Sequence, residues 1–221
     1  MSAGSNGIEA RDVIIVIDDD LSVREALDSL FRSVGYNVVT FGAAADFLAT
    51  RSVPLSGCVV LDVRLPGISG LDFQTQLAQL DIRLPIVFMT GHGDIPMSVR
   101  AMKAGAVDFL AKPFRDQDML DAVTAAIGRS HRSREEEAMC ADVRQRIDTL
   151  TVREREVLAH VVSGLMNKQI AHLLGLSEIT VKIHRGNVMK KTKARSVADL
   201  VRMYDSLKMN ARNRTDSYTS E

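Results

Sequence analysis

The chain has 221 residues, of which 46% are hydrophobic and 25% are charged, so it is large enough for one big globular domain or two small ones. Its formal net charge of zero hides an uneven distribution, because residues 1–127 carry −6, residues 128–148 are neutral and residues 149–221 carry +6. An acidic first part and a basic last part suggest a cation site in the former and an anionic partner for the latter.

The sequence argues against secretion and membrane insertion. Residues 1–11 are polar and lack the apolar core of a signal peptide, and no apolar run approaches the length of a membrane span. We therefore expect a cytoplasmic protein without a membrane partner. Cys58 and Cys140 have neither CxxC nor metal-ligand spacing, so we expect both to be reduced thiols.

Short apolar runs alternate with longer segments in which apolar residues recur every three or four positions, from about residue 12 to residue 128. This alternation is typical of a doubly wound parallel sheet with helices on both faces, so we predict an α/β domain. The predicted strands lie at 13–17, 37–41, 58–61, 85–89 and 107–110. The predicted helices lie at 21–33, 43–49, 71–80, 97–104 and 116–129.

The rest of the chain has a helical pattern. Residues 129–146 are highly charged and contain no Pro, which favours a helical linker over a flexible tether. Residues 147–208 are predicted to form an all-helical domain. Residues 209–221 are polar and rich in Asn, Arg, Ser and Thr, so we expect a disordered tail.

Acidic residues and one lysine follow the strands of the predicted sheet. Asp18 and Asp19 come after the first strand, Asp62 after the third and Lys112 after the fifth. In open α/β sheets the carboxyl ends of the strands form the ligand site, so these side chains are expected to converge there. Carboxylates placed so close repel one another unless a cation neutralises them, and Mg²⁺ is the natural candidate.

Such a site can accept a phosphoryl group. Asp62 can attack phosphorus to give an acyl phosphate, Lys112 can hold the phosphoryl oxygens, and Thr90, at the end of the fourth strand, can donate a hydroxyl. The Lys112-Pro113 bond is a candidate cis peptide that would help to aim the lysine.

Four motifs together resemble the receiver domain of bacterial two-component response regulators, over about residues 12–128. They are Asp18-Asp19, Asp62–Gly67, Thr90–Asp94 and Phe109–Phe114. The resemblance implies a flavodoxin-like five-stranded sheet of order 2-1-3-4-5.

The resemblance also implies roles for individual residues. Asp62 is the expected phosphoacceptor, and Thr90 and Phe109 are the expected switch pair. The expected Mg²⁺ ligands are the carboxylates of Asp18, Asp19 and Asp62 and the backbone carbonyl of Arg64.

Helix-start signals divide the C-terminal part. Thr151-x-x-Glu154 and Ser196-x-x-Asp199 resemble capping boxes, and Ser177 can cap a helix between them. Gly175 suits the left-handed turn that precedes Ser177, as in a helix-turn-helix. The helix from Glu178 to about Thr192 would then present cationic side chains to the major groove.

Residues 147–208 resemble the LuxR-type DNA-binding domain, a four-helix domain whose third helix, at about 178–192, is the recognition helix. The motifs are those around Thr151–Leu158, Asn167–Ala171 and Thr180–Arg185. The residues expected to contact DNA are Lys182, Ile183, Arg185, Asn187, Lys190 and Lys191. The last helix, about 197–208, is expected to mediate dimerisation through Val197, Leu200 and Val201.

The two halves together resemble NarL/FixJ-type response regulators and lean toward the FixJ-like branch. This resemblance implies a non-enzymatic transcriptional regulator, usually an activator, that a sensor histidine kinase phosphorylates. The implied partners are double-stranded promoter DNA, RNA polymerase and a second copy of the chain on phosphorylation.

Two other functions are built on the same kind of sheet. A phosphohydrolase with an aspartate nucleophile could use the same sheet, but it gives no role to the basic helices. A flavin-binding module needs Gly/Ser/Thr-rich phosphate loops, and Asp18–Asp20 stands where the first loop should be.

Overall fold

A computed structural model describes residues 12–50, 56–91 and 95–216. The chain divides into two compact units, residues 1–134 and 135–221. The first unit runs through β1 (Val13–Ile17), α1 (Leu21–Ser33), β2 (Asn37–Phe41), α2 (Ala44–Leu48), β3 (Gly57–Asp62), α3 (Gly70–Gln79), β4 (Ile86–Thr90), α4 (Ile95–Lys103), β5 (Asp108–Ala111) and the start of α5 (Asp116–Asp148). The second unit continues with α6 (Val152–Val162), α7 (Asn167–Leu174), α8 (Glu178–Thr192) and α9 (Val197–Asp216).

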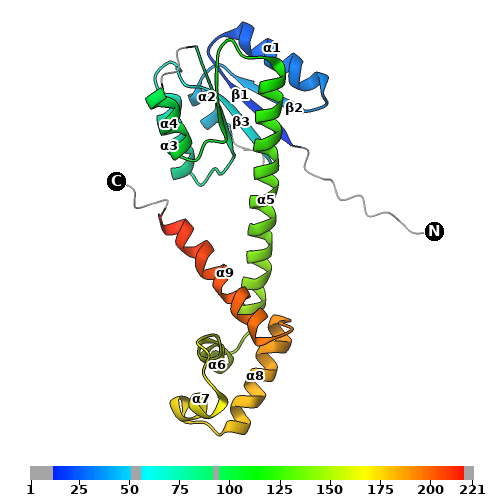
Figure 1. Cartoon of the computed structure of the whole chain (residues 1–221), viewed down its shortest axis with the longest axis vertical. Helices are drawn as coiled ribbons and strands as arrows, with labels where there is room; N and C mark the ends of the chain where they lie inside the picture. Colours follow the sequence, from blue (N-terminus) through cyan, green and yellow to red (C-terminus); the bar gives the residue numbers. More distant parts are fainter. Residues whose placement is uncertain (1–11, 51–55, 92–94, 217–221) are drawn as a thin grey trace, which may run out of the picture. The chain divides into compact units, whose positions relative to one another are not determined.

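The described strands form a five-stranded parallel sheet of order β2-β1-β3-β4-β5 (Figure 1), which confirms the predicted fold and order. In the register of the sheet, Ile17 at the end of β1 pairs with Leu61 of β3, and Asp62 pairs with Met89 of β4. The residues that follow β1 and those that end β3 therefore reach the same edge of the sheet, as the acidic site requires.

Helices cover both faces of the sheet (Figure 1). Alternate residues of the inner strands belong to the cores on opposite faces. On one face, α1 and α5 pack over the strands with the buried side chains of Leu27, Phe31, Met119, Val123 and Ile127. On the other face, α2, α3 and α4 contribute Phe47, Phe73, Leu77 and Ala101. Because both faces are covered, the inner strands β1, β3 and β4 are apolar along almost their whole length, and this is why they read as nearly unbroken apolar runs.

Local capping explains the bounds of α1, which coincide with the prediction. The Asp20 side chain accepts a hydrogen bond from the Ser22 N–H at 2.8 Å and so caps the start of the helix. Two residues after the end of the helix, Gly35 has a φ of 91°, a left-handed conformation that Gly adopts without strain.

The stretch 129–146, predicted as a helical linker, is helical and continuous with the preceding helix, because α5 runs unbroken from Asp116 to Asp148. An ion pair between Arg146 and Asp142, one turn apart, lies near its C-terminal end. Although α5 and α9 are long, no helix in the described part of the chain is apolar enough over a sufficient length to cross a membrane.

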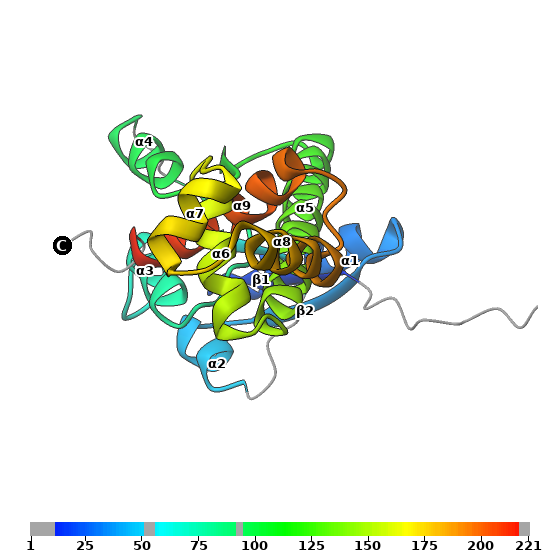
Figure 2. The same cartoon turned by 90° about the horizontal axis from the view of Figure 1, so that it is seen from below.

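The second unit is a helical domain in which α8 packs against α6 and α7 (Figure 2). Its core contains the buried side chains of Val157, Ile170, Val181, Val188 and Leu200. The predicted capping box at Thr151 is present, because the Thr151 hydroxyl accepts from the Glu154 N–H at 3.3 Å and Glu154 Oε2 accepts from the Thr151 N–H at 2.9 Å.

Two predictions at the end of the chain need correction. At Ser196, the hydroxyl accepts from the Asp199 N–H at 3.1 Å, but the Asp199 carboxylate accepts from the Arg195 N–H instead of that of Ser196, so the box is not reciprocal. The tail predicted as disordered over 209–221 is helical up to Asp216, because no Gly or Pro interrupts α9. Residues 217–221 lie outside the described part of the chain.

The two cysteines lie in different environments. Cys58 is buried in β3, and burial raises the pKa of its thiol to about 12, so the group stays protonated at neutral pH and is a poor nucleophile. Cys140 lies half-buried on α5.

Candidate functional site

Three carboxylates meet at the carboxyl edge of the sheet. Asp18 and Asp19 follow β1 and Asp62 ends β3, and each offers an oxygen within 4.8 Å of the oxygens of the other two. Asp18 and Asp62 are buried, whereas Asp19 is exposed. The cluster is therefore closed on the protein side and open to solvent on the other.

Lys112 reaches into this cluster from the segment that follows β5. Its Nζ lies 2.6 Å from Asp18 Oδ2 and 2.7 Å from Asp62 Oδ2. The Lys112-Pro113 peptide is cis, as predicted. One ammonium is thus shared between two buried carboxylates, and its single charge leaves the three acids with a net negative charge.

Burial and charge shift the pKa values of this cluster. Burial raises the pKa of the Asp18 carboxyl, and the hydrogen bonds from Lys112 and the Asp20 N–H offset that rise only in part. For Lys112, burial is the largest influence and lowers the pKa, but the hydrogen bonds and charges of Asp18 and Asp62 together outweigh it, so the pKa is raised. Lys112 is therefore a fixed positive charge at physiological pH.

Backbone and side-chain donors hold the acidic loops in place. Asp62 Oδ1 accepts from the Arg64 N–H at 3.0 Å, and Asp18 Oδ1 accepts from the Asp20 N–H at 2.8 Å. The guanidinium of Arg24, on α1, donates to the Asp18 carbonyl at 2.6 Å. The sequence analysis did not predict this contact. Arg24 lies in the first turn of the helix that follows Asp18 and Asp19, and this position could have pointed to it.

The donor set fits Mg²⁺. Three carboxylates are hard oxygen ligands, their net charge is negative, and the exposed position of Asp19 leaves room for a partly hydrated ion. The Arg64 N–H bonds to Asp62, but no described contact involves the Arg64 carbonyl at the site, so its predicted role as a ligand remains a prediction.

Thr90 and Phe109 occupy neighbouring strands beside the cluster. Thr90 ends β4 and is buried, and its carbonyl accepts from the Lys112 N–H at 2.7 Å. Phe109, in β5, is half-buried and packs beside Phe88 with ring centroids 6.4 Å apart. Their switch role stays a prediction, and residues 92–94 of the following loop lie outside the described part of the chain.

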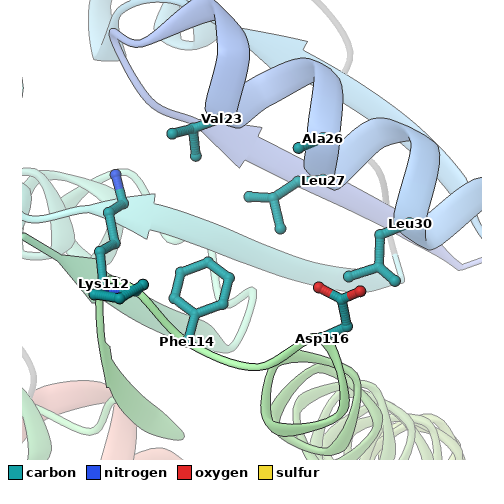
Figure 3. Close-up of a pocket in the computed structure, with 8 residues that line it drawn as sticks. Val23, Ala26, Leu27, Leu30, Lys112, Phe114 and Asp116 are labelled. Atoms are coloured by element: carbon teal, nitrogen blue, oxygen red, sulfur yellow. The ribbon is translucent and has the colours of Figure 1, made fainter.

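An apolar pocket of about 450 Å³ opens beside Lys112, between α1 and the segment after β5. Figure 3 shows Val23, Leu27 and Leu30 of α1 on one side and Lys112 and Phe114 on the other. Its two walls are distant in the sequence, so no local pattern could have revealed it.

The helix-turn-helix is present, with the predicted left-handed turn and helix cap. Gly175 forms the C-cap of α7, with a φ of 64° and a ψ of 36°, the left-handed conformation expected there. The Ser177 hydroxyl accepts from the Thr180 N–H at 3.1 Å and caps α8. The bounds of α8, Glu178–Thr192, agree with the predicted recognition helix.

The predicted DNA contacts on α8 divide into two groups. The exposed group comprises Lys182, Ile183, Asn187 and Lys190. The other two bond within the domain, because Arg185 Nη1 donates to Asn167 Oδ1 at 2.7 Å and Lys191 Nζ lies 2.7 Å from Glu154 Oε2.

Lys191 has a buried partner within its own domain. Glu154 is 3% exposed, and its hydrogen bonds from Lys191 and from the Thr151 N–H lower its pKa. Lys191 also donates to the Thr149 carbonyl at 3.4 Å. Its ammonium joins α8 to the start of α6, and its predicted contact with DNA stays a prediction.

The predicted dimerisation residues of α9 also differ from one another. Leu200 is 1% exposed and lies in the core of its own domain, so it is not part of the surface that α9 presents. Val197 is 41% exposed and Val201 is half-buried. The spacing of the three residues on one helix could not separate the core position from the outward ones.

Two family models match this chain. The model for the response regulator receiver domain matches residues 14–124, and the model for bacterial regulatory proteins of the luxR family matches residues 148–204. The first covers the acidic cluster, and the second covers the helix-turn-helix.

Relatives of known name share both parts. Nodulation protein W of Bradyrhizobium diazoefficiens is 55% identical over 208 residues, which are 94% of this chain and 92% of that protein. Transcriptional regulatory protein FixJ of Azorhizobium caulinodans is 49% identical over 189 residues, or 85% and 89% of the two chains. The structure of response regulator StyR has a TM-score of 0.75 and 48% identity, covering 89% of this chain and 99% of that one.

These matches span both units and agree with the acidic cluster of one and the helix-turn-helix of the other. They favour a transcriptional regulator over the phosphohydrolase and flavin-binding alternatives. The chain belongs to the response regulators that join a receiver domain to a LuxR-type DNA-binding domain and has FixJ-like proteins among its relatives.

Proposed function

We propose that a sensor histidine kinase phosphorylates this regulator on Asp62 and that phosphorylation controls DNA binding in the cytoplasm. The observation that carries the proposal is the convergence of Asp18 and Asp62 on the Lys112 ammonium, at 2.6 and 2.7 Å. A nucleophilic carboxylate beside a fixed positive charge and an excess of negative charge is suited to a phosphoryl group that arrives with a divalent cation.

The residues have separate tasks in the transfer. An oxygen of Asp62 attacks phosphorus, the P–N bond of the kinase phosphohistidine breaks, and the electron pair stays on the imidazole nitrogen, which then takes a proton. Lys112 holds a phosphoryl oxygen through a charge-assisted hydrogen bond. Asp18, Asp19 and Asp62 would hold Mg²⁺, which supplies positive charge to offset the crowded oxygens.

Phosphorylation would act on the second unit through the surface of the first. The phosphoryl group adds charge and three acceptor oxygens beside Thr90, whose hydroxyl would turn toward it and leave space for Phe109 to turn inward. The surface formed by α4 and β5 would change and favour a homodimer. Support comes from the position of the two residues, because Thr90 ends β4, the strand next to β3, and Phe109 lies on β5, the strand next to β4.

Two linked DNA-binding domains would then occupy two half-sites of a promoter, because linkage raises avidity without new contacts. Lys182, Ile183, Asn187 and Lys190 are the proposed DNA contacts, since they are exposed on α8. Val197 and Val201 remain candidates for dimer contacts. We further infer that the bound dimer engages RNA polymerase as an activator, as suits a family of transcriptional regulators.

The test of phosphorylation is intact-mass spectrometry of the full chain after incubation with a small acyl phosphate and Mg²⁺. Wild type should gain one phosphoryl group, and Asp62→Asn should gain none. Asp72→Asn, which changes an exposed acid on α3, is the matched control and should behave like wild type. An adduct of equal yield on Asp62→Asn would overturn the assignment of the phosphoacceptor.

The apolar pocket beside Lys112 is the proposed docking surface for the kinase, because a donor that delivers phosphorus to Asp62 must cover this neighbouring surface. Ala26 lines the pocket and is exposed, so Ala26→Asp places a charge in it with little effect on the core. The control is Ala78→Asp, at an exposed helical position on α3.

Two phosphodonors, the phosphorylated kinase and a small acyl phosphate, distinguish an effect on kinase docking from an effect on the transfer reaction. We expect Ala26→Asp to slow transfer from a phosphorylated kinase about tenfold or more, since a desolvated charge in an apolar contact costs at least about 1.4 kcal/mol. Transfer from the small acyl phosphate should be unchanged. Equal rates of transfer from the kinase to Ala26→Asp and Ala78→Asp would exclude the pocket as the docking surface.

A further inference from the structure

The recognition helix α8 presents an apolar strip to solvent. Its buried side is formed by Val181, Val188 and Thr192. On the opposite side Ile179 is 74% exposed and Ile183 is 59% exposed. These two isoleucines are four residues apart and therefore adjacent on one helix face, and Ile179 lies in the first turn.

Packing within the domain does not explain why these apolar residues stand on the exposed face of α8. Isoleucine loses side-chain freedom in a helix, and its exposure leaves apolar surface in water. Gly186 lies one turn beyond Ile183 on the same face, although Gly is a poor helix former. A Cβ at Gly186 would meet nothing within 4 Å, so packing within the domain does not require Gly. Ile179, Ile183 and Gly186 together make a face shaped for close approach by a partner.

The charges around the strip favour DNA as that partner. Lys182 and Lys190 are exposed on either side of Gly186 on the same helix, and no acidic residue follows Glu178 in α8. The first turns of a recognition helix meet base edges, whereas cations further along contact phosphates. In the major groove the apolar group that a base presents is the 5-methyl of thymine.

We propose that Ile179 is a specificity-determining residue that reads a thymine 5-methyl group in the half-site, with Ile183 as its apolar neighbour. The inference rests on DNA binding by the C-terminal domain and does not depend on phosphorylation of Asp62. It adds a residue to the proposed contacts and states the chemical feature of the base that the residue recognises.

The experiment first selects sites from a random double-stranded DNA library with the full chain, with and without prior treatment with an acyl phosphate and Mg²⁺. Each thymine of the selected half-site is then replaced by uracil, which removes the 5-methyl and keeps the pairing edge. Binding of wild type, Ile179→Ala, Ile183→Ala and Val152→Ala is measured on every duplex. Val152 is a suitable control because it is an apolar side chain that is 75% exposed and lies on α6, not on the recognition helix.

We expect at least one uracil substitution to weaken binding of wild type by about fourfold, the factor expected for losing the burial of one methyl group. Ile179→Ala should bind the thymine site more weakly by a similar factor or more and should no longer respond to that uracil substitution. Val152→Ala should keep the full response. Because Ile179 is exposed, the alanine variant should retain the thermal unfolding midpoint of wild type within error.

Other outcomes would overturn the inference. Binding of wild type that no uracil substitution weakens would mean that the isoleucines do not read thymine and serve another partner, such as a protein. An undiminished uracil response in Ile179→Ala would exclude Ile179 as the reader. If the library yields no enriched sequence under either condition, the proposal that this chain binds specific DNA sites also fails. This result differs from a selected site that shows no uracil response, so failure of DNA binding and failure of the Ile179 proposal are distinguishable.

Discussion

Lys112 and Lys191 each hold a buried carboxylate at the same distance, but in different kinds of site. Lys112 Nζ lies 2.7 Å from Asp62 in the first unit, and Lys191 Nζ lies 2.7 Å from Glu154 in the second. From the sequence, both lysines were assigned to function. In the structure Lys112 joins an acidic cluster, whereas Lys191 joins two helices of its own domain.

The difference lies in how many carboxylates each ammonium serves. Glu154 has Lys191 and the Thr151 N–H as donors, and these hydrogen bonds lower its pKa. In the acidic cluster, one ammonium serves both Asp18 and Asp62, and burial raises the pKa of Asp18. An ammonium paired with one carboxylate holds two elements together, whereas three acids around one ammonium keep a net negative charge and can still take a cation and a phosphoryl group.

The largest expected effect comes from Lys112→Ala. Removing the fixed charge beside Asp62 should slow phosphorylation by an acyl phosphate about 100-fold, the usual cost of losing an electrostatic donor to a charged transition state. Time-resolved intact-mass spectrometry measures the rate. Lys103→Ala, at an exposed position at the end of α4, should leave it unchanged. A Lys112→Ala rate near that of wild type would make Lys112 structural and erase the contrast with Lys191.

A smaller effect is expected from Lys191→Ala. Glu154 would remain buried without its partner, which should reduce the free energy of unfolding of the second unit by about 1–2 kcal/mol. This is less than the 3–5 kcal/mol for fully buried pairs, because the Lys191 side chain is 36% exposed and water screens it.

The neighbouring lysine provides the control. Lys190 is exposed, so Lys190→Ala should leave stability unchanged and weaken DNA binding, with a smaller salt dependence. Denaturant unfolding and DNA titrations at several salt concentrations measure the two properties. If Lys191→Ala were as stable as wild type and lost salt-dependent affinity like Lys190→Ala, Lys191 would be a phosphate contact after all.

The smallest expected effects are opposite in sign and depend on pH. A raised folded pKa means that the contribution of Asp18 to stability is complete below its ordinary value of 3.8 and is lost as the pH rises through the folded pKa. Asp18→Asn should therefore be more stable than wild type at pH 7 without Mg²⁺, by on the order of 1 kcal/mol. The difference should vanish as the pH falls toward 3.8.

For Glu154 the sign is reversed. Its lowered pKa gives stability that is present above the ordinary value of 4.5 and is lost as the pH falls through the folded pKa. Glu154→Gln should therefore be less stable than wild type at pH 7, and the gap should close below pH 4.5. Hydrogen exchange of peptides from each unit, measured across this range, separates the two trends. Trends of the same sign would show that the two carboxylates are not in contrasting environments.

Features that depend on short stretches of sequence were predictable. The bounds of α1 and α8 agree with the prediction, because a capping side chain starts each helix, Asp20 for the first and Ser177 for the second. The convergence of Asp18, Asp62 and Lys112 also followed, since the carboxyl ends of parallel strands must share one edge.

Features that depend on which side chains meet were not predictable. Leu200 and Val197 are both apolar residues near the start of α9, but only contact with the other helices shows that Leu200 is in the core. Ile179 and Val181 are both apolar residues of α8, but only packing shows that Val181 is buried and that Ile179 is 74% exposed.

The sequence by itself determined the order of strands and helices, the helix caps and the acidic edge, because hydrophobic periodicity, turn residues and strand ends act over a few residues. Only the tertiary structure decided which lysine holds a structural carboxylate, which α9 residues face outward and where the pocket beside Lys112 opens. Those properties depend on pairs such as Lys191 with Glu154, 37 positions apart, which only the packing of separate elements brings together.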